Sequence, residues 1–228
     1  MIETLVPLFN SAALVTIRLT LWGVLLAFFV GVIGNLVYFY KIPGLTWLMG
    51  AYTELSRNTP LLAHLFFLFF GLPMLGINLS GFACGVIGLT FLGGSYMMEA
   101  IRGGVEAVAK TQRESALSLG LSRSQMLWYV ILPQAFRTAL SALAANVIFL
   151  LRESALVSVI AVPELMHMAR SQIGMFFRTD EVLIMLTLYY LVLIAPLSLF
   201  FYLLEKRVRL GSKVRTRPSR LRLLKGRG

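Results

Sequence analysis

Five long apolar runs constrain the fold of this chain more than any other feature of its sequence. Each is close to the roughly 20 apolar residues that a helix needs to cross the hydrocarbon core of a bilayer. The runs cover residues 19–40, 61–79, 82–98, 139–162 and 182–204. Because 58% of the residues are hydrophobic and only 14% are charged, the composition is that of a membrane protein. The sequence predicts an all-α integral membrane protein with about five transmembrane helices.

Basic residues concentrate in two places, the segment 102–137 and the tail 206–228. Lys and Arg favour the cytoplasmic side of a membrane, and two predicted spans separate these segments, so both can face the cytoplasm. Counting back three spans places the N-terminus outside. We therefore expect one transmembrane domain over residues 1–205, with a cytoplasmic loop at about 102–137, and a basic cytoplasmic tail over 206–228.

The net charge of +11 also raises nucleic acid as a partner. However, the basic residues follow the predicted topology and form no RNA- or DNA-binding motif. A basic run directly after a membrane helix is typical of an anchor to anionic lipid. We expect the tail to contact the lipid membrane and no nucleic acid.

Segments between the runs have their own patterns. Residues 41–60 mix aromatic and charged side chains, which predicts an interfacial helix on the cytoplasmic side, with the second span beginning at Pro60. Residues 163–181 are too polar to cross and are predicted at the outer surface. Glycines recur in and next to the runs at spacings that indicate close helix packing. They are Gly31, Gly34, Gly81, Gly85, Gly88, Gly93 and Gly94.

The segment 102–137 is patterned for order. Helix-forming stretches are interrupted at Gly120 and Pro133, which predicts two short helices with a turn at Gly120. Small residues at Ser115, Ala116 and Gly120 allow close approach to a partner, and Glu114 can orient that partner through a charged hydrogen bond. Apolar contact is expected from Leu117, Leu119, Leu121 and Met126. The alternative is that the loop folds back on its own bundle.

The order Glu114, Ala116, Gly120, followed by Ile-Leu-Pro at 131–133, resembles the cytoplasmic coupling loop of bacterial ABC importer permeases, the family's Glu-Ala-Ala motif. Two positions depart from that pattern, since Ser115 stands for the usual second alanine and Val130 for isoleucine. Further stretches resemble the polar amino acid branch of these permeases. They are 56–62 (SRNTPLL), 69–73 (FFGLP) and 152–158 (RESALVS). The resemblance covers roughly residues 19–205.

This resemblance implies an ABC type I importer permease fold in the bacterial inner membrane. It implies two permease subunits, identical or homologous, an ABC ATPase subunit dimer and an extracytoplasmic solute-binding protein. ATP and Mg would be used by the ATPase, and this chain would bind no cofactor. The coupling contacts implied are Glu114, Ser115, Ala116, Gly120, Leu132 and Pro133.

Charge inside a span is costly, so an intramembrane ionisable residue indicates function. Arg152 and Glu153 lie in the fourth run, and Glu153 is a candidate to meet the α-ammonium group of a substrate. A structural hydrogen bond or a contact with the second permease is the alternative. Glu99 is a further candidate on the substrate path, although its spacing from Arg102 equally predicts a local helical ion pair.

Other classes fit the sequence less well. The chain has no phosphate-cradling Gly-x-x-x-x-Gly-Lys-Ser/Thr motif, so ATP hydrolysis would belong to a separate subunit. His64 and His167 are isolated, and no metal site is expected. An ion-gradient-driven secondary transporter usually has more spans and inverted repeats. That class and an ABC importer of another small polar solute remain the alternatives.

Overall fold

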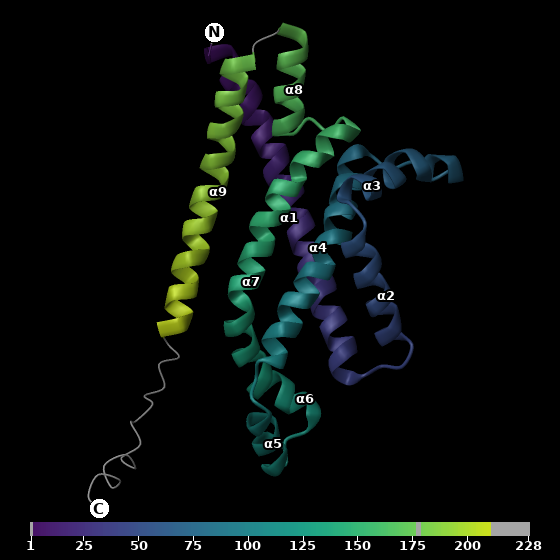
Figure 1. Cartoon of the computed structure of the whole chain (residues 1–228), viewed down its shortest axis with the longest axis vertical. Helices are drawn as coiled ribbons and strands as arrows, with labels where there is room; N and C mark the ends of the chain where they lie inside the picture. Colours follow the sequence, from purple (N-terminus) through teal and green to yellow (C-terminus); the bar gives the residue numbers. More distant parts are fainter. Residues whose placement is uncertain (1, 177–178, 211–228) are drawn as a thin grey trace, which may run out of the picture.

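The computed structural model describes residues 2–176 and 179–210, and this part of the chain is helical throughout, apart from short connections. In chain order the elements are α1 (Ile2–Tyr40), α2 (Leu45–Asn58), α3 (Leu61–Phe66), η1 (Phe67–Gly71), η2 (Leu72–Leu75), α4 (Gly81–Glu106), α5 (Lys110–Ser118), α6 (Arg123–Met126), η3 (Leu127–Ile131), α7 (Leu132–Glu153), η4 (Ser154–Ile160), α8 (Leu165–Phe176) and α9 (Thr179–Leu210). Figure 1 shows the long helices aligned along one axis. The expected all-α architecture is confirmed.

Close helix packing at glycine holds α1, α4 and α7 together. A Cβ atom on Gly93 of α4 would lie 2.6 Å from Leu150 Cδ1 of α7 and 2.9 Å from Ala27 Cβ of α1. A Cβ atom on Gly31 of α1 would lie 2.8 Å from Met97 Cβ. The backbones approach this closely because no side chain separates them. The glycines therefore serve packing, as their spacing predicts.

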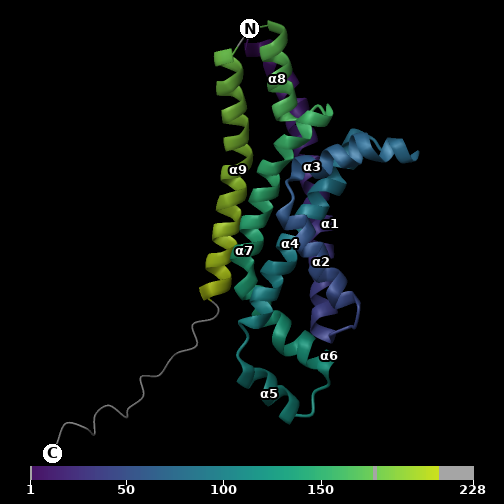
Figure 2. The same cartoon turned by 45° about the vertical axis from the view of Figure 1, so that its right-hand side comes forward.

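The region predicted as a cytoplasmic interfacial helix is built differently. Helix α2 lies lengthwise beside α1 and α4 (Figure 2). Its Tyr52 hydroxyl and Ser56 hydroxyl both donate to the carbonyl of Phe91 on α4, at 2.7 and 2.9 Å. The chain then bends by 102° before the segment 61–75. The structure thus pairs α2 with the segment 61–75 as one bent candidate span, where the sequence predicts an interfacial helix followed by a span that begins at Pro60.

Four helices are long and apolar enough to cross a membrane, and the bent pair of α2 with the segment 61–75 raises the number to five, counted over the described residues. Helix α1 begins at residue 2, well before the predicted start of its span. Its first turns pack against α8 and α9, where Leu5 and Phe9 meet Leu165 and Met185. The predicted tail boundary falls inside α9, and residues 211–228 lie outside the described residues.

Pro133 does not break its helix, contrary to the predicted interruption. A π-helical turn, η3, comes just before it, and the Leu132 N–H bonds to the Leu127 carbonyl, five residues back. Proline lacks an N–H and crowds the carbonyl four residues earlier. The wider turn accommodates this, so the helix from residue 123 to 160 stays continuous. The same arrangement precedes Pro73, where η1 is also a π-helical turn.

Candidate functional site

The loop between α4 and α7 forms two short helices joined by a turn at Gly120, as predicted. Gly120 adopts φ +76°, a backbone conformation that glycine reaches without strain. The turn is closed by hydrogen bonds from the N–H groups of Gly120 and Leu121 to the carbonyls of Leu117 and Ala116, at 2.9 and 3.2 Å. Ser122 then caps α6 in a reciprocal pair with Gln125.

One face of this loop packs against the helices of its own chain. Ala116 is buried against a cluster shared with Met126, Ile131 and Ala135, and Leu121 packs onto the same cluster. The apolar contact expected of Leu121 and Met126 toward a partner is therefore made within the chain. It holds α5 against α6 and the first turns of α7.

The opposite face is exposed. Leu117 is 52% exposed and Leu119 is 81% exposed, and Ser115 and Gly120 are also exposed. Glu114 is solvent-accessible and lies 3.5 Å from Lys110 one turn earlier, a pair worth little by itself. This face of the loop therefore presents two leucine side chains that the chain itself leaves largely uncovered.

The remaining coupling candidates lie at the start of α7. Pro133 is exposed and Leu132 is half-buried, next to the π-helical turn. A further link is made by Arg113, whose Nη2 donates to the carbonyl of Val105, and no sequence pattern indicates it. This bond ties α5 to the last turn of α4, so the loop is joined to the bundle at both ends.

Arg152 and Glu153 are the last residues of α7, immediately before η4. Arg152 is exposed and Glu153 is half-buried. Within the described part of the chain, neither side chain makes a hydrogen bond or an ion pair. A half-buried carboxylate without a partner in a span is costly. Glu153 and Arg152 therefore remain candidates for contact with a group other than the described residues.

Glu99, in contrast, is fully engaged. Arg102 donates to both of its carboxylate oxygens, at 3.1 and 2.7 Å, and also binds Glu106 at 2.7 Å. Arg57 of α2 lies 3.7 Å from Glu99 and stacks over the Tyr96 ring at 5.2 Å. The local pair predicted from the spacing is present. The added link from α2 joins positions 42 residues apart, and no local pattern predicts it.

The geometry defines a class: a bundle of helices long and apolar enough to cross a membrane, with an ordered and partly exposed helical loop at one end, is a multi-pass membrane protein. Residues 20–210 match the family described as "Binding-protein-dependent transport system inner membrane component". The chain belongs to this family of ABC importer permeases. It is therefore a multi-pass inner-membrane transport subunit, not an enzyme, and it works with ATPase and permease partners.

Relatives and solved structures agree with this family assignment. The probable glutamine ABC transporter permease protein GlnM of Bacillus subtilis is 39% identical over 164 residues, which are 72% of this chain and 76% of the relative. The arginine transport system permease protein ArtQ of the same species is 29% identical over 90% of this chain and 94% of its own. A crystal structure of an amino acid ABC transporter with histidines superimposes with a TM-score of 0.85 at 33% identity, covering 90% of this chain and 96% of that chain.

Proposed function

We propose that this chain is the permease subunit of an ATP-driven importer that translocates polar amino acids. The observation that carries the proposal is its similarity, over nine-tenths of its length, to an amino acid ABC transporter solved with histidines. Relatives named for glutamine and arginine point to the same substrate class. These amino acids share an α-ammonium and an α-carboxylate group, so a common site needs groups that recognise both.

Arg152 and Glu153 supply such groups near the outer end of α7. In the proposed role, the carboxylate of Glu153 meets the α-ammonium group, and Arg152 meets an anionic group of the substrate or the second permease. Their lack of partners within the described residues supports this assignment. Glu99 takes a different part, because its ion pairs hold α2 against α4. It shapes the substrate path and does not contact the substrate.

The loop at the other end is proposed to dock on the ATPase dimer, which binds ATP and Mg. Leu117 and Leu119 would enter an apolar groove, Glu114 and Ser115 would supply polar contacts, and Gly120 would allow the close approach. Ala116, Leu132 and Pro133 would act indirectly by fixing the shape of the loop. The solute-binding protein would deliver substrate at the opposite end, near α8, with the N-terminus outside and the C-terminus in the cytoplasm.

Uptake into proteoliposomes tests the function. The complex with its ATPase and binding protein is expected to accumulate at least one labelled polar amino acid in the presence of ATP. Glu153→Gln should weaken this uptake by tenfold or more, since a charged contact contributes about 1.5–3 kcal/mol. Glu181→Gln, at the start of α9, is the matched control and should leave uptake unchanged. Uptake driven by an ion gradient without ATP would contradict the proposal, and uptake of other polar solutes alone would change the substrate class.

Docking of the loop is tested by replacing its most exposed leucine. Leu119→Ser should reduce the affinity for the ATPase about tenfold, because the burial of a leucine is worth about 1.5–3 kcal/mol. Leu119→Met keeps the apolar contact and should retain association. The thermal stability of the isolated permease should be equal in both variants, since Leu119 touches little of its own chain. Equal ATPase affinity in the two variants would remove the docking role.

A further inference from the structure

The last described turns of α9 combine apolar and basic side chains on an open surface. Figures 1 and 2 show this end of α9 beside α7, on the side of the bundle that carries the loop. A groove of about 450 Å³ lies here. Its lining consists of three apolar and two basic residues, which are Phe200, Leu203, Leu204, Lys206 and Arg207. The proposed substrate contacts, Arg152 and Glu153, lie at the other end of α7 and are not part of this groove.

The two cations of the groove have no partner in the described part of the chain. Lys206 and Arg207 are exposed, and neither makes a hydrogen bond or an ion pair with a described residue. The neighbouring carboxylate of Glu205 is directed toward α7, where it accepts a hydrogen bond from the Ser141 hydroxyl at 2.6 Å. Glu205 therefore ties α9 to α7, and the two positive charges beside it stay available to an external anion.

A further cation lies on α7. Arg137 precedes Ser141 by four residues, which places it about 6 Å along the helix and on nearly the same side. Ser141 is the residue that meets α9. Arg137 is exposed, and it too lacks an ion pair among the described residues. Both helices therefore present unpaired positive charge at this end of their contact.

Aromatic side chains indicate that this end of the bundle lies at a membrane–water interface. Trp128 and Tyr129, just before α7, and Tyr202 on α9 are all exposed, and Trp and Tyr are enriched where lipid headgroups begin. Lys and Arg near the end of a membrane helix extend their charge toward the headgroups while their stems stay against apolar surface. The cations of the groove thus lie at the depth of lipid phosphates, and its apolar residues lie at the depth of acyl chains.

The apolar part of the groove selects the kind of anion. Phe200 and Leu203 are exposed and precede the cations by one to two turns of α9. A small inorganic anion would meet the cations and leave these side chains uncovered. A zwitterionic phospholipid would cover them but carries no net charge to match two free cations. A phospholipid with net negative charge satisfies both parts of the groove, and basic pockets beside membrane helices are typical sites for such lipids.

We propose that this groove binds an anionic phospholipid, whose phosphate contacts Lys206 and Arg207 and whose acyl chain packs against Phe200 and Leu203. In the proposed orientation of the chain this lipid belongs to the cytoplasmic leaflet, and only that choice of leaflet rests on the proposed function. The lipid covers apolar side chains that the chain itself leaves open, and its charge offsets the two cations. It therefore stabilises the end of α9 beside α7.

Native mass spectrometry of the complex of this chain with its ATPase tests the proposal. The delipidated complex in detergent is titrated with phosphatidylglycerol and, separately, with phosphatidylethanolamine of the same acyl chains. Half-saturation by phosphatidylglycerol is expected at a concentration about tenfold lower or less, because only this lipid carries net negative charge. A large excess of inorganic phosphate should not displace it, since phosphate cannot cover Phe200 and Leu203. Equal retention of the two lipids, or displacement by phosphate, overturns the proposal.

Paired variants locate the bound lipid. Lys206→Gln combined with Arg207→Gln should weaken the retention of phosphatidylglycerol about tenfold or more, whereas Lys206→Arg combined with Arg207→Lys keeps both charges and should preserve it. Lys41→Gln combined with Arg170→Gln removes the same charge from two exposed positions outside the groove and should leave retention unchanged. Equal retention in the two charge-removing variants overturns the site on α9. Retention in detergent requires neither transport nor a direction of insertion, so a failure here is distinct from a failure of the proposed function.

Discussion

Glu164 shows how a single buried carboxyl group can set the conditions for stability. It is completely buried between α1, α8 and α9. Its Oε1 accepts a hydrogen bond from the His167 N–H at 2.7 Å, and its Oε2 receives a longer one from the Tyr190 hydroxyl at 3.5 Å. Burial raises the pKa of Glu164 to about 7, and these hydrogen bonds lower it only partly. Below about pH 7, the folded protein therefore holds the Glu164 carboxyl group mainly in its protonated form.

The consequence is a pH-dependent stability with a definite sign. Between about pH 4.5 and 7 the folded state binds more protons than the unfolded state, so the free energy of unfolding falls as pH rises. Because one pKa unit corresponds to about 1.4 kcal/mol, the loss is about 3 kcal/mol at most. Glu164→Gln keeps an acceptor for the His167 N–H and removes the titration.

Thermal unfolding of the purified permease measured across about pH 4.5 to 8 checks this prediction. Relative to the Gln variant, the wild-type melting temperature should decline as pH rises toward 7 and then level off. A constant difference between the two proteins over this range would show that Glu164 does not titrate there.

At the scale of elements, the contact between α4 and α7 offers a matched pair of adjacent glycines. A Cβ atom on Gly104 would lie 2.5 Å from the Ala135 carbonyl oxygen and 2.9 Å from Ala139 Cβ, whereas one on Gly103 would meet nothing within 4 Å. Gly104→Ala should destabilise the protein by about 1–3 kcal/mol. Gly103→Ala should be neutral or stabilise it by up to about 1 kcal/mol, since alanine favours a helix. Melting temperatures of the two variants in detergent decide the matter, and equal values would contradict a close contact at Gly104.

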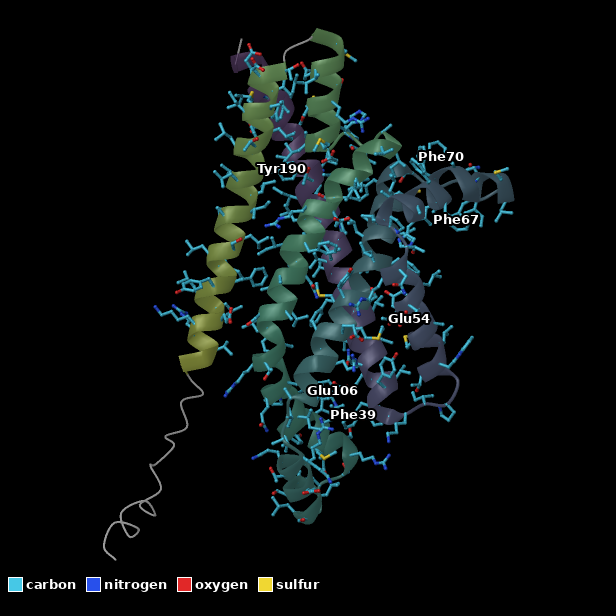
Figure 3. The ribbon with its side chains drawn as sticks, viewed as in Figure 1. Phe39, Glu54, Phe67, Phe70, Glu106 and Tyr190 are labelled. Atoms are coloured by element: carbon cyan, nitrogen blue, oxygen red, sulfur yellow. The ribbon has the colours of Figure 1, made fainter. Side chains whose placement is uncertain are left out.

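The sequence predicts well those helices whose side chains are apolar along their whole length. It predicts poorly the helices whose polar side chains form hydrogen bonds inside the bundle. Helix α2 carries Glu54 and Arg57, so its pattern indicates an interface, yet Ser56 and Tyr52 hydrogen-bond to α4. The apolar segment 61–75 has the composition of a straight span but leads away at 102°. Figure 3 shows Phe67 and Phe70 on this projecting segment. A hydropathy run gives the composition of a segment but does not show in which direction its helix runs.

The loop was predictable for a different reason. Gly120 interrupts two helix-forming stretches, and a glycine in that position predicts the turn that its positive φ confirms. The division of the loop into faces was not predictable in the same way. Ala116 and Leu117 are neighbours, and only the packing of α5 on Ile131 and Ala135 decides that one is buried and the other exposed. Glu153 is a candidate from the sequence alone because a charged residue inside an apolar run is conspicuous without any structure.

At the scale of the whole molecule, the two ends of the bundle are formed by different elements. The loop helices α5 and α6 lie at one end, and α8 and the N-terminal turns of α1 lie at the other (Figure 1). Helix α9 begins beside α8 and runs toward the loop end. With α2 and the bent segment 61–75 counted as one span, the described residues hold five candidate spans. Five crossings would place Ile2 and Leu210, the first and last described residues, on opposite sides of the membrane, as the proposed orientation requires.

Accessibility to a membrane-impermeant maleimide tests the proposed orientation. The single native cysteine, Cys84, is completely buried, so the wild-type chain should remain unlabelled in the folded state. Asn78→Cys lies in the exposed connection before α4 and should react in intact spheroplasts. Gln112→Cys lies on exposed α5 and should react only after permeabilisation, because the loop must reach an ATPase on the cytoplasmic side. The reverse labelling pattern would place the loop on the outer side of the membrane, away from the ATPase. It would therefore contradict both the proposed orientation and the proposed docking contact of Leu119.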